Sequence, residues 1–210
     1  MGQLTKTNND RKVAFVLGNG LSRLQFDISQ LSKHGTVIGC NRIYDHLIPD
    51  YIVSVDKPMI DIILMDDVQM KTKVFIDGRV YRQHYKHCKS LYPIDADVNG
   101  IIGSGDLACM LACVLEHTHV YMIGFDYISK NDKINNVYTG RKPYKPIGST
   151  HTLPISIQNW YNKFEIVINR YPDVQFIRVN ANNFIPPVTA TNFTNCDGEH
   201  FNKLFPGIYV

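Results

Sequence analysis

Val13-Ala14-Phe15-Val16-Leu17-Gly18-Asn19-Gly20-Leu21-Ser22 is the stretch that decides the fold. Its first five residues are apolar without interruption, as in a strand that is covered on both faces of a parallel sheet. Gly18 and Gly20 allow a tight turn and a close approach of a ligand to the backbone. Asn19 and Ser22 place polar side chains just beyond the strand, at the edge where open α/β sheets bind ligands. A phosphate or a ribose is the expected ligand of this turn, although a plain strand-to-helix loop gives the same sequence pattern.

Size and composition indicate an ordinary soluble domain. The chain has 210 residues, 44% hydrophobic and 20% charged, which suits one domain, or one domain with an appended lid. The net charge of +3 is spread along the chain and does not indicate a nucleic-acid surface. Five cysteines without a CxxC pair indicate a reducing compartment. The longest apolar run, 107–115, is shorter than the roughly 20 residues that span a bilayer, and no signal peptide precedes residue 13. We therefore expect a cytoplasmic protein without a membrane span.

Alternating strands and helices predict the α/β class, with a Rossmann-like, mostly parallel sheet and helices on both faces. After the first strand, strands are expected at 36–40, 51–55, 73–76, 120–124 and 174–179, and helices at 58–66, 104–117 and 155–171. Residues 23–34 predict a short helix or turn, and 78–98 give no clear pattern. Residues 1–12 are expected to be a flexible arm, 13–180 the ligand-binding domain, and 181–210 an irregular tail packed on the domain.

Residues 128–152 are polar and rich in Asn, Lys, Gly and Pro. A connection of this length without regular structure is usually a functional lid or a disordered segment. Its tyrosines, Tyr138 and Tyr144, and its basic residues favour a lid.

Polar residues follow the ends of four predicted strands. Asn19, Asn41, Asp56 and Asp126 hold these positions, and Ser104-Gly105 opens the most apolar helix, with Ser104 as its expected N-cap. The carboxyl ends of parallel strands share one edge of the sheet, so these groups should meet in one crevice with the helix N-terminus. Each residue has an alternative interpretation as a turn or cap residue. Together they predict a ligand site.

The order of these motifs resembles the bacterial sialyltransferases of glycosyltransferase family 42. The resemblance is carried by Gly18-Asn19-Gly20-Leu21-Ser22, Cys40-Asn41-Arg42, Ser104-Gly105 and Gly124-Phe125-Asp126-Tyr127. The chain is also similar to the related domain of the motility accessory factor and of MptE-like proteins, on the segment Pro49 to Asp56. The resemblance covers roughly residues 13–180, and it lies in the order and spacing of short motifs.

The resemblance implies a nucleotide-binding, glycosyltransferase-like domain that takes a nucleotide-sugar donor such as CMP-sialic acid. It implies that the donor is bound by Gly18, Asn19, Gly20, Ser22, Asn41, Asp56, Ser104, Gly105 and Asp126, and that the lid tyrosines, Tyr138 and Tyr144, face the leaving phosphate. It also implies a histidine between lid and helix as the general base, a place that His151 occupies. A histidine whose pKa is near neutrality suits this role.

Two positions depart from the family pattern. Leu21 replaces a proline, and Asp56 stands where the sialyltransferases tend to have asparagine. A carboxylate beside a phosphate repels it unless a cation intervenes, which leaves room for Mg²⁺ at Asp56 and for a diphosphate donor. No other metal or cofactor is expected.

Two other functions stay open from the sequence. One is an MptE-like pyrophosphokinase or another nucleotide-using transferase, and the other is a non-catalytic nucleotide-binding module. The acceptor is open as well, as a glycan, a small molecule or a modified nucleobase, and a homo-oligomer is compatible with the sequence.

Overall fold

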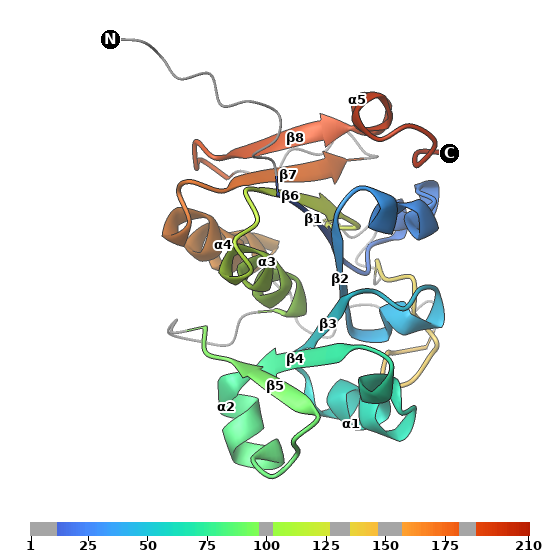
Figure 1. Cartoon of the computed structure of the whole chain (residues 1–210), viewed down its shortest axis with the longest axis vertical. Coiled ribbons are helices and arrows are strands. Elements are labelled where there is room, and N and C mark those ends of the chain that lie inside the picture. The colour runs from blue at the N-terminus through green and yellow to red at the C-terminus, as the bar shows by residue number, and fades with distance from the viewer. Residues whose placement is uncertain (1–11, 97–102, 127–134, 147–156, 181–187) are drawn as a thin grey trace.

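One sheet of eight parallel strands forms the centre of the protein (Figure 1). The structure, a computed structural model, describes residues 12–96, 103–126, 135–146, 157–180 and 188–210. The strand order is β5-β4-β3-β2-β1-β6-β7-β8, and all neighbouring strands run in the same direction. The chain adds strands outward on one side of β1 and then crosses over to β6 on the other side. This reversal between β1 and β6 is the place where an open α/β sheet forms a ligand crevice.

The predicted α/β class is confirmed, and most elements lie where the sequence predicts them. The strands are Val13–Leu17 (β1), Thr36–Cys40 (β2), Tyr51–Ser54 (β3), Lys73–Asp77 (β4), Leu91–Ile94 (β5), His119–Ile123 (β6), Gln175–Asn180 (β7) and Phe193–Asp197 (β8). The α-helices are Lys57–Met65 (α1), Gly78–Val80 (α2), Ser104–Val114 (α3), Ile157–Arg170 (α4) and Gly198–Leu204 (α5). Four 3-10 helices, Leu21–Gln25 (η2), Ile28–Lys33 (η3), Asn41–Asp45 (η4) and Val68–Met70 (η5), and a π-turn, Tyr81–Tyr85 (η6), complete the described elements.

Successive side chains along each strand point to opposite faces of the sheet and pack in two separate cores. Ala14 and Val16 of β1 pack in the core beneath α3 and α4, whereas Phe15 and Leu17 pack in the core beneath α1, α5 and the 3-10 helices. Both faces of β1 are therefore dry, which explains why its sequence is apolar at every position.

Helix α3 lies against the sheet with almost every side chain buried. It packs on β1, β2 and β3, and α4 lies beside it on the same face of the sheet (Figure 1). A helix that is apolar nearly all round needs such neighbours, because an exposed face would leave several large apolar side chains in water. In the part of the chain that the structure describes, no helix is both long enough and apolar enough to cross a membrane.

The structure defines one region that the sequence left open and corrects the prediction for another. Residues 78–98 contain the short edge strand β5, which pairs with β4. The tail from residue 181, expected to be irregular, supplies β8 and α5, and β8 pairs with β7 through the whole of its length. The domain therefore extends beyond residue 180. Asn, Gly and Pro flank both β8 and α5 in the sequence. These residues are typical of turns and loops, so the five-residue strand between them is hard to recognise from the sequence.

Helix α5 provides a test of how far the C-terminal segment supports the fold. Phe201 is fully buried, with its ring 6.2 Å from that of Phe15 and 5.7 Å from that of Tyr121. Replacing Phe201 by Ala should lower the free energy of unfolding by about 3–5 kcal/mol, because a large cavity opens beneath the sheet. Leu204→Ala on the same helix is the matched control, since Leu204 is 40% exposed. Urea unfolding measures the free energy of unfolding of both variants. If Phe201→Ala lowers it no more than the control does, α5 is not an essential part of the fold.

Candidate active site

The glycine turn after β1 is joined directly to the end of β6. The Gly18 amide donates to the Ile123 carbonyl at 2.8 Å, and the Gly20 amide donates to the Gly124 carbonyl at 2.9 Å. A Cβ at residue 20 would lie 2.5 Å from the carboxylate carbon of Asp126, so only glycine permits this approach. The Asp126 carboxylate accepts from the amide of Ser22, at 3.0 Å, and from its hydroxyl. Ser22 and Asp126, both expected to bind the donor, therefore bind each other and fix the turn.

Asn19 projects from this turn beneath the lid. Its side-chain amide donates to the hydroxyl of Tyr144 at 3.1 Å. Its Oδ1 atom is buried, and no hydrogen-bond partner reaches it within the described structure. Turning the amide over would only transfer the unmet hydrogen bond from oxygen to nitrogen. A buried polar atom without a partner is costly in a folded protein, and a bound ligand is one way to satisfy it.

Asn41 links the ends of β2 and β3 to the start of α3. It takes a left-handed backbone conformation, with φ of 56°, that Asn tolerates better than most residues. Its Oδ1 atom accepts from the Ser54 hydroxyl at 2.9 Å and from the Ser104 hydroxyl at 3.0 Å. The Ser104 oxygen in turn accepts from the Val55 amide at 3.2 Å. The N-cap of α3 is Gly103 rather than the expected Ser104, whose hydroxyl joins this network.

The described part of the lid, residues 135–146, lies against the glycine turn and η4. The Val137 amide donates to the Asn19 carbonyl at 2.9 Å, and the Leu21 amide donates to the Asn135 side chain at 2.8 Å. The rings of Tyr138 and Tyr144 stack with their centroids 6.0 Å apart. The polar segment predicted as a lid thus covers the turn at this point.

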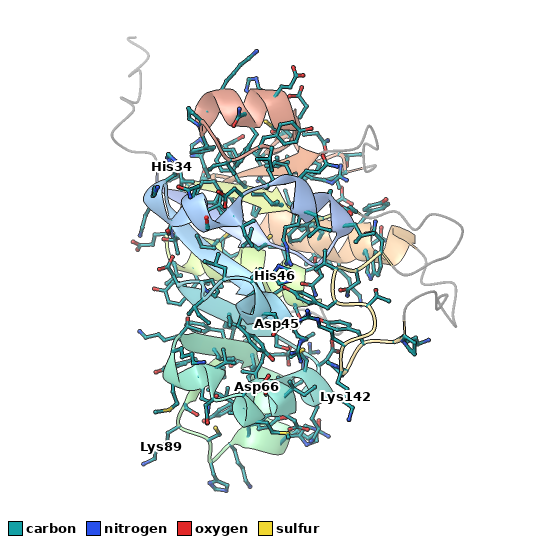
Figure 2. The ribbon with its side chains drawn as sticks, turned by 90° about the vertical axis from the view of Figure 1, so that its right-hand side faces the viewer. His34, Asp45, His46, Asp66, Lys89 and Lys142 are labelled. Atoms are coloured by element: carbon teal, nitrogen blue, oxygen red, sulfur yellow. The ribbon has the colours of Figure 1, made fainter. Side chains whose placement is uncertain are left out.

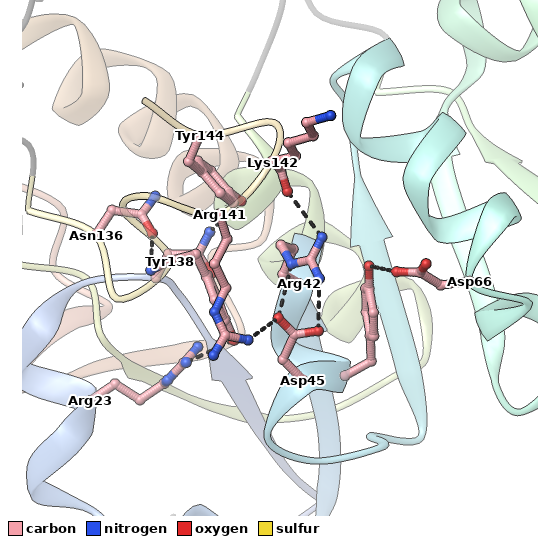
Figure 3. Close-up of polar contacts among 11 residues, drawn as sticks. Arg23, Arg42, Asp45, Asp66, Asn136, Tyr138, Arg141, Lys142 and Tyr144 are labelled. Carbon is pink, nitrogen blue, oxygen red and sulfur yellow. Dashed lines mark hydrogen bonds and ion pairs between the residues drawn. The ribbon is translucent and has the colours of Figure 1, made fainter. Parts of the chain in front are cut away.

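Two arginines and Asp45 tie the lid to η4 (Figure 3). Arg42 donates to both carboxylate oxygens of Asp45, at 2.9 and 3.1 Å, and to the Lys142 carbonyl at 2.9 Å. Arg141 reaches Asp45 from the lid at 2.7 Å. Burial favours the protonated acid, but hydrogen bonds from Arg42 and Arg141 outweigh it and lower the pKa of Asp45. Asp45 and Lys142 lie on the molecular face shown in Figure 2.

Tyr138 and Tyr144 have different surroundings. Tyr138 is fully buried, and its hydroxyl accepts from the guanidinium of Arg23 at 2.8 Å. Arg23, itself buried, also donates to the Gly18 carbonyl at 2.9 Å. The Tyr144 hydroxyl accepts from Asn19, and burial raises the pKa of Tyr144 although a hydrogen bond from Asn41 lowers it. Of the two tyrosines expected to face a phosphate, Tyr144 is therefore the one at the Asn19–Asn41 crevice.

Asp56 lies at the end of β3, as the N-cap of α1. Its side chain is exposed, but surrounding protein still desolvates the carboxylate enough to raise its pKa. The negative charge of Asp56 also raises the pKa of Tyr144, which places the two groups in one electrostatic environment.

Within the residues that the structure describes, no three His, Cys, Asp or Glu side chains come together to hold a metal ion. Mg²⁺ at Asp56 would therefore need further ligands, such as a substrate phosphate and water.

His151 lies outside the described residues, so its position relative to the crevice is not defined. Arg23 and the Arg42–Asp45–Arg141 network could not be singled out from the sequence, because one charged residue in a turn does not indicate its distant partner. The position of Arg42 directly after the Cys40-Asn41 pair was the one feature of the sequence that pointed toward this network.

Asp106, in the first turn of α3, gives a pH-dependent test of this site. Its carboxylate accepts from the Gly103 amide at 2.9 Å, and burial raises its pKa from 3.8 to about 6. The folded protein thus binds this proton more tightly than the unfolded chain does. The contribution of Asp106 to the free energy of unfolding therefore falls as pH rises from about 4 to about 6, and then levels off. The pKa shift of Asp106 corresponds to a change of roughly 3 kcal/mol in the free energy of unfolding.

Asp106→Asn keeps an acceptor for the Gly103 amide but cannot ionise. The stability of the wild type relative to this variant should fall by up to roughly 3 kcal/mol across that pH interval. Denaturant unfolding at several pH values measures the difference, and a flat profile would contradict the buried state of Asp106.

Comparison with known proteins gives a likeness in structure only. No family model and no curated protein matches the sequence. The sialyltransferase CstII from Campylobacter jejuni, in complex with cytidine-5'-monophosphate, is 14% identical with a TM-score of 0.57, over 86% of each chain. The monofunctional alpha-2,3-sialyltransferase Cst-I from the same organism is 14% identical with a TM-score of 0.55, over 91% of this chain and 90% of its own. The expected resemblance is thus confirmed in three dimensions, and the chain has the fold of these sialyltransferases.

Proposed function

We propose that the protein is a glycosyltransferase that moves a sugar from a CMP-activated donor to an acceptor hydroxyl. The observation that carries the proposal is the unsatisfied Oδ1 atom of Asn19, buried under the lid at the sheet's reversal point. Sialyltransferases of similar structure that bind CMP support the choice of donor.

The donor would lie between the glycine turn and the start of α3. Asn19 offers it a neutral acceptor that no protein group uses, and Asn41 and Ser104, bonded to each other, would line the site beside it. Gly18, Gly20 and Gly105 would act by letting the turn and the helix start pack closely on residues 124–126. The Tyr144 hydroxyl would donate to the leaving phosphate, since its raised pKa keeps it protonated. Ser22, Asp126 and Tyr138 would act by holding the turn and lid, because their polar groups are already bonded to protein.

Asp56 would accept a hydrogen bond from a hydroxyl of the donor. A carboxylate accepts strongly from hydroxyl groups, and this role needs no metal. If Asp56 holds Mg²⁺ instead, then donor binding will depend on the ion.

The chemistry would be a single displacement at the anomeric carbon. The acceptor oxygen forms a bond to that carbon as the bond to the phosphate oxygen breaks, and CMP leaves. His151 would take the acceptor proton, an assignment that rests on the family resemblance. A closed lid would keep water from competing with the acceptor.

Removal of the Asn19 side chain tests the binding site. Asn19→Ala should weaken CMP binding by about 1–3 kcal/mol, because it removes a buried hydrogen-bonding group at the ligand. Calorimetry with CMP, UDP, GDP, ADP and AMP gives the affinities, and the exposed Asn169→Ala is the matched control. Equal CMP affinity in a folded Asn19→Ala variant would remove Asn19 from the site.

The same titrations separate the competing functions. CMP should bind most tightly of the five nucleotides, with equal affinity in EDTA and in Mg²⁺. Preference for AMP or ADP with a requirement for Mg²⁺ would favour the pyrophosphokinase instead, and would return Asp56 to a metal-binding role.

Replacement of His151 tests the proposed base. His151→Ala should lower turnover by about 10²–10⁴-fold while CMP affinity stays unchanged, because the base meets the acceptor rather than the donor. Hydrolysis or transfer of CMP-sialic acid provides the assay, with the exposed His87→Ala as the control. Near-normal turnover in His151→Ala would require a different base.

A further inference from the structure

Arg178 of β7 is a buried charge that the proposed chemistry does not use. Only 1% of its surface is exposed. Its Nε donates to the Phe125 carbonyl at 2.6 Å, and one terminal nitrogen donates to the Asp126 carbonyl at 3.1 Å. Its other terminal nitrogen donates to the Asn195 side chain on β8 at 3.2 Å. The guanidinium therefore connects the two C-terminal strands to the segment that follows β6.

The backbone after β6 is shaped to receive this side chain. Gly124 has a φ of +78°, which ends the strand and turns the chain. The next two carbonyls are then available to Arg178, and a planar guanidinium fits two neighbouring acceptors better than a single ammonium does. Without Arg178, two carbonyls at the turn would lose a charged donor, and the segment would relax to find other partners.

The segment Gly124–Asp126 contacts both halves of the proposed donor site. The Asp126 carboxylate holds Ser22, and the Gly124 carbonyl accepts from the Gly20 amide, so the segment fixes the turn that carries Asn19. The Phe125 ring packs on the start of α3, where a Cβ at Gly105 would lie 2.7 Å from the ring. Movement of Gly124–Asp126 would displace the turn and the helix start together.

We infer that Arg178 is a positioning residue that sets the Asn19 turn and the Ser104–Gly105 helix start in register for the donor. It touches no part of the proposed ligand and acts through the Phe125 and Asp126 carbonyls. The binding readout of this inference rests on the proposed function, whereas its structural readout does not.

Hydrogen exchange and CMP calorimetry on the full chain test the inference. Arg178→Met should speed exchange of the amides in residues 18–23 at least tenfold, leave β2 amides unchanged, and weaken CMP binding at least tenfold. Arg178→Lys should recover part of both effects, since an ammonium still reaches one carbonyl. Val179→Ala, a buried neighbour on the same strand, is the control for general loss of stability and should leave both readouts near wild type.

A second variant keeps the test decisive if Arg178→Met does not fold. Asn195→Ala removes one partner of the guanidinium from an exposed position, and should raise exchange in residues 18–23 by a smaller factor. Uniform acceleration across all strands, or equal effects of Val179→Ala, would reduce Arg178 to a general stabiliser and overturn the inference. If the wild type binds no CMP, the proposed function fails, while the exchange pattern still decides the role of Arg178.

Discussion

The hydrogen bonds between the glycine turn and the end of β6 are the constraint on which the site depends. Amides of Gly18 and Gly20 donate to the Ile123 and Gly124 carbonyls, so the turn after the first strand is held by a strand that comes about a hundred residues later in the chain. This junction lies where the order of the sheet reverses, which is the place where open α/β sheets bind ligands. The proposed donor site lies where these two strand ends are joined to each other and covered by residues 135–146 of the lid.

Sequence patterns predicted the inner part of the fold well, for a physical reason. β1, β2, β3 and β6 are dry on both faces, so their apolar runs are unbroken and easy to recognise. The edge strands β5 and β8 have exposed positions and polar neighbours, and α5 has only seven residues. Their positions follow from pairing with β4 and β7, which is tertiary information that short polar segments do not carry.

The location of the candidate site was predictable from the sequence, but the role of each residue in it was not. Strand-end positions brought Asn19, Asn41 and Asp56 toward one edge because all the strands are parallel. Side-chain pairing then separated residues that the sequence treats alike: Asp126 is bonded to Ser22, and Tyr138 to Arg23, whereas Asn19 keeps an unmet acceptor. Such a distinction depends on distances between residues more than a hundred positions apart.

The charges around the crevice bear on the kind of phosphate it suits. Arg23 is bonded to Gly18 and Tyr138, and Arg42 and Arg141 both bind Asp45, so these three arginines already serve the turn and the lid. Among the residues that the structure describes, the groups at the proposed donor site are amides and hydroxyls beside the carboxylate of Asp56. Neutral donors can stabilise the single phosphate of a CMP-activated sugar, whereas a diphosphate concentrates more negative charge and commonly brings Mg²⁺. On the proposed function, the same arrangement that builds the crevice from neutral groups therefore favours a monophosphate donor over a diphosphate one.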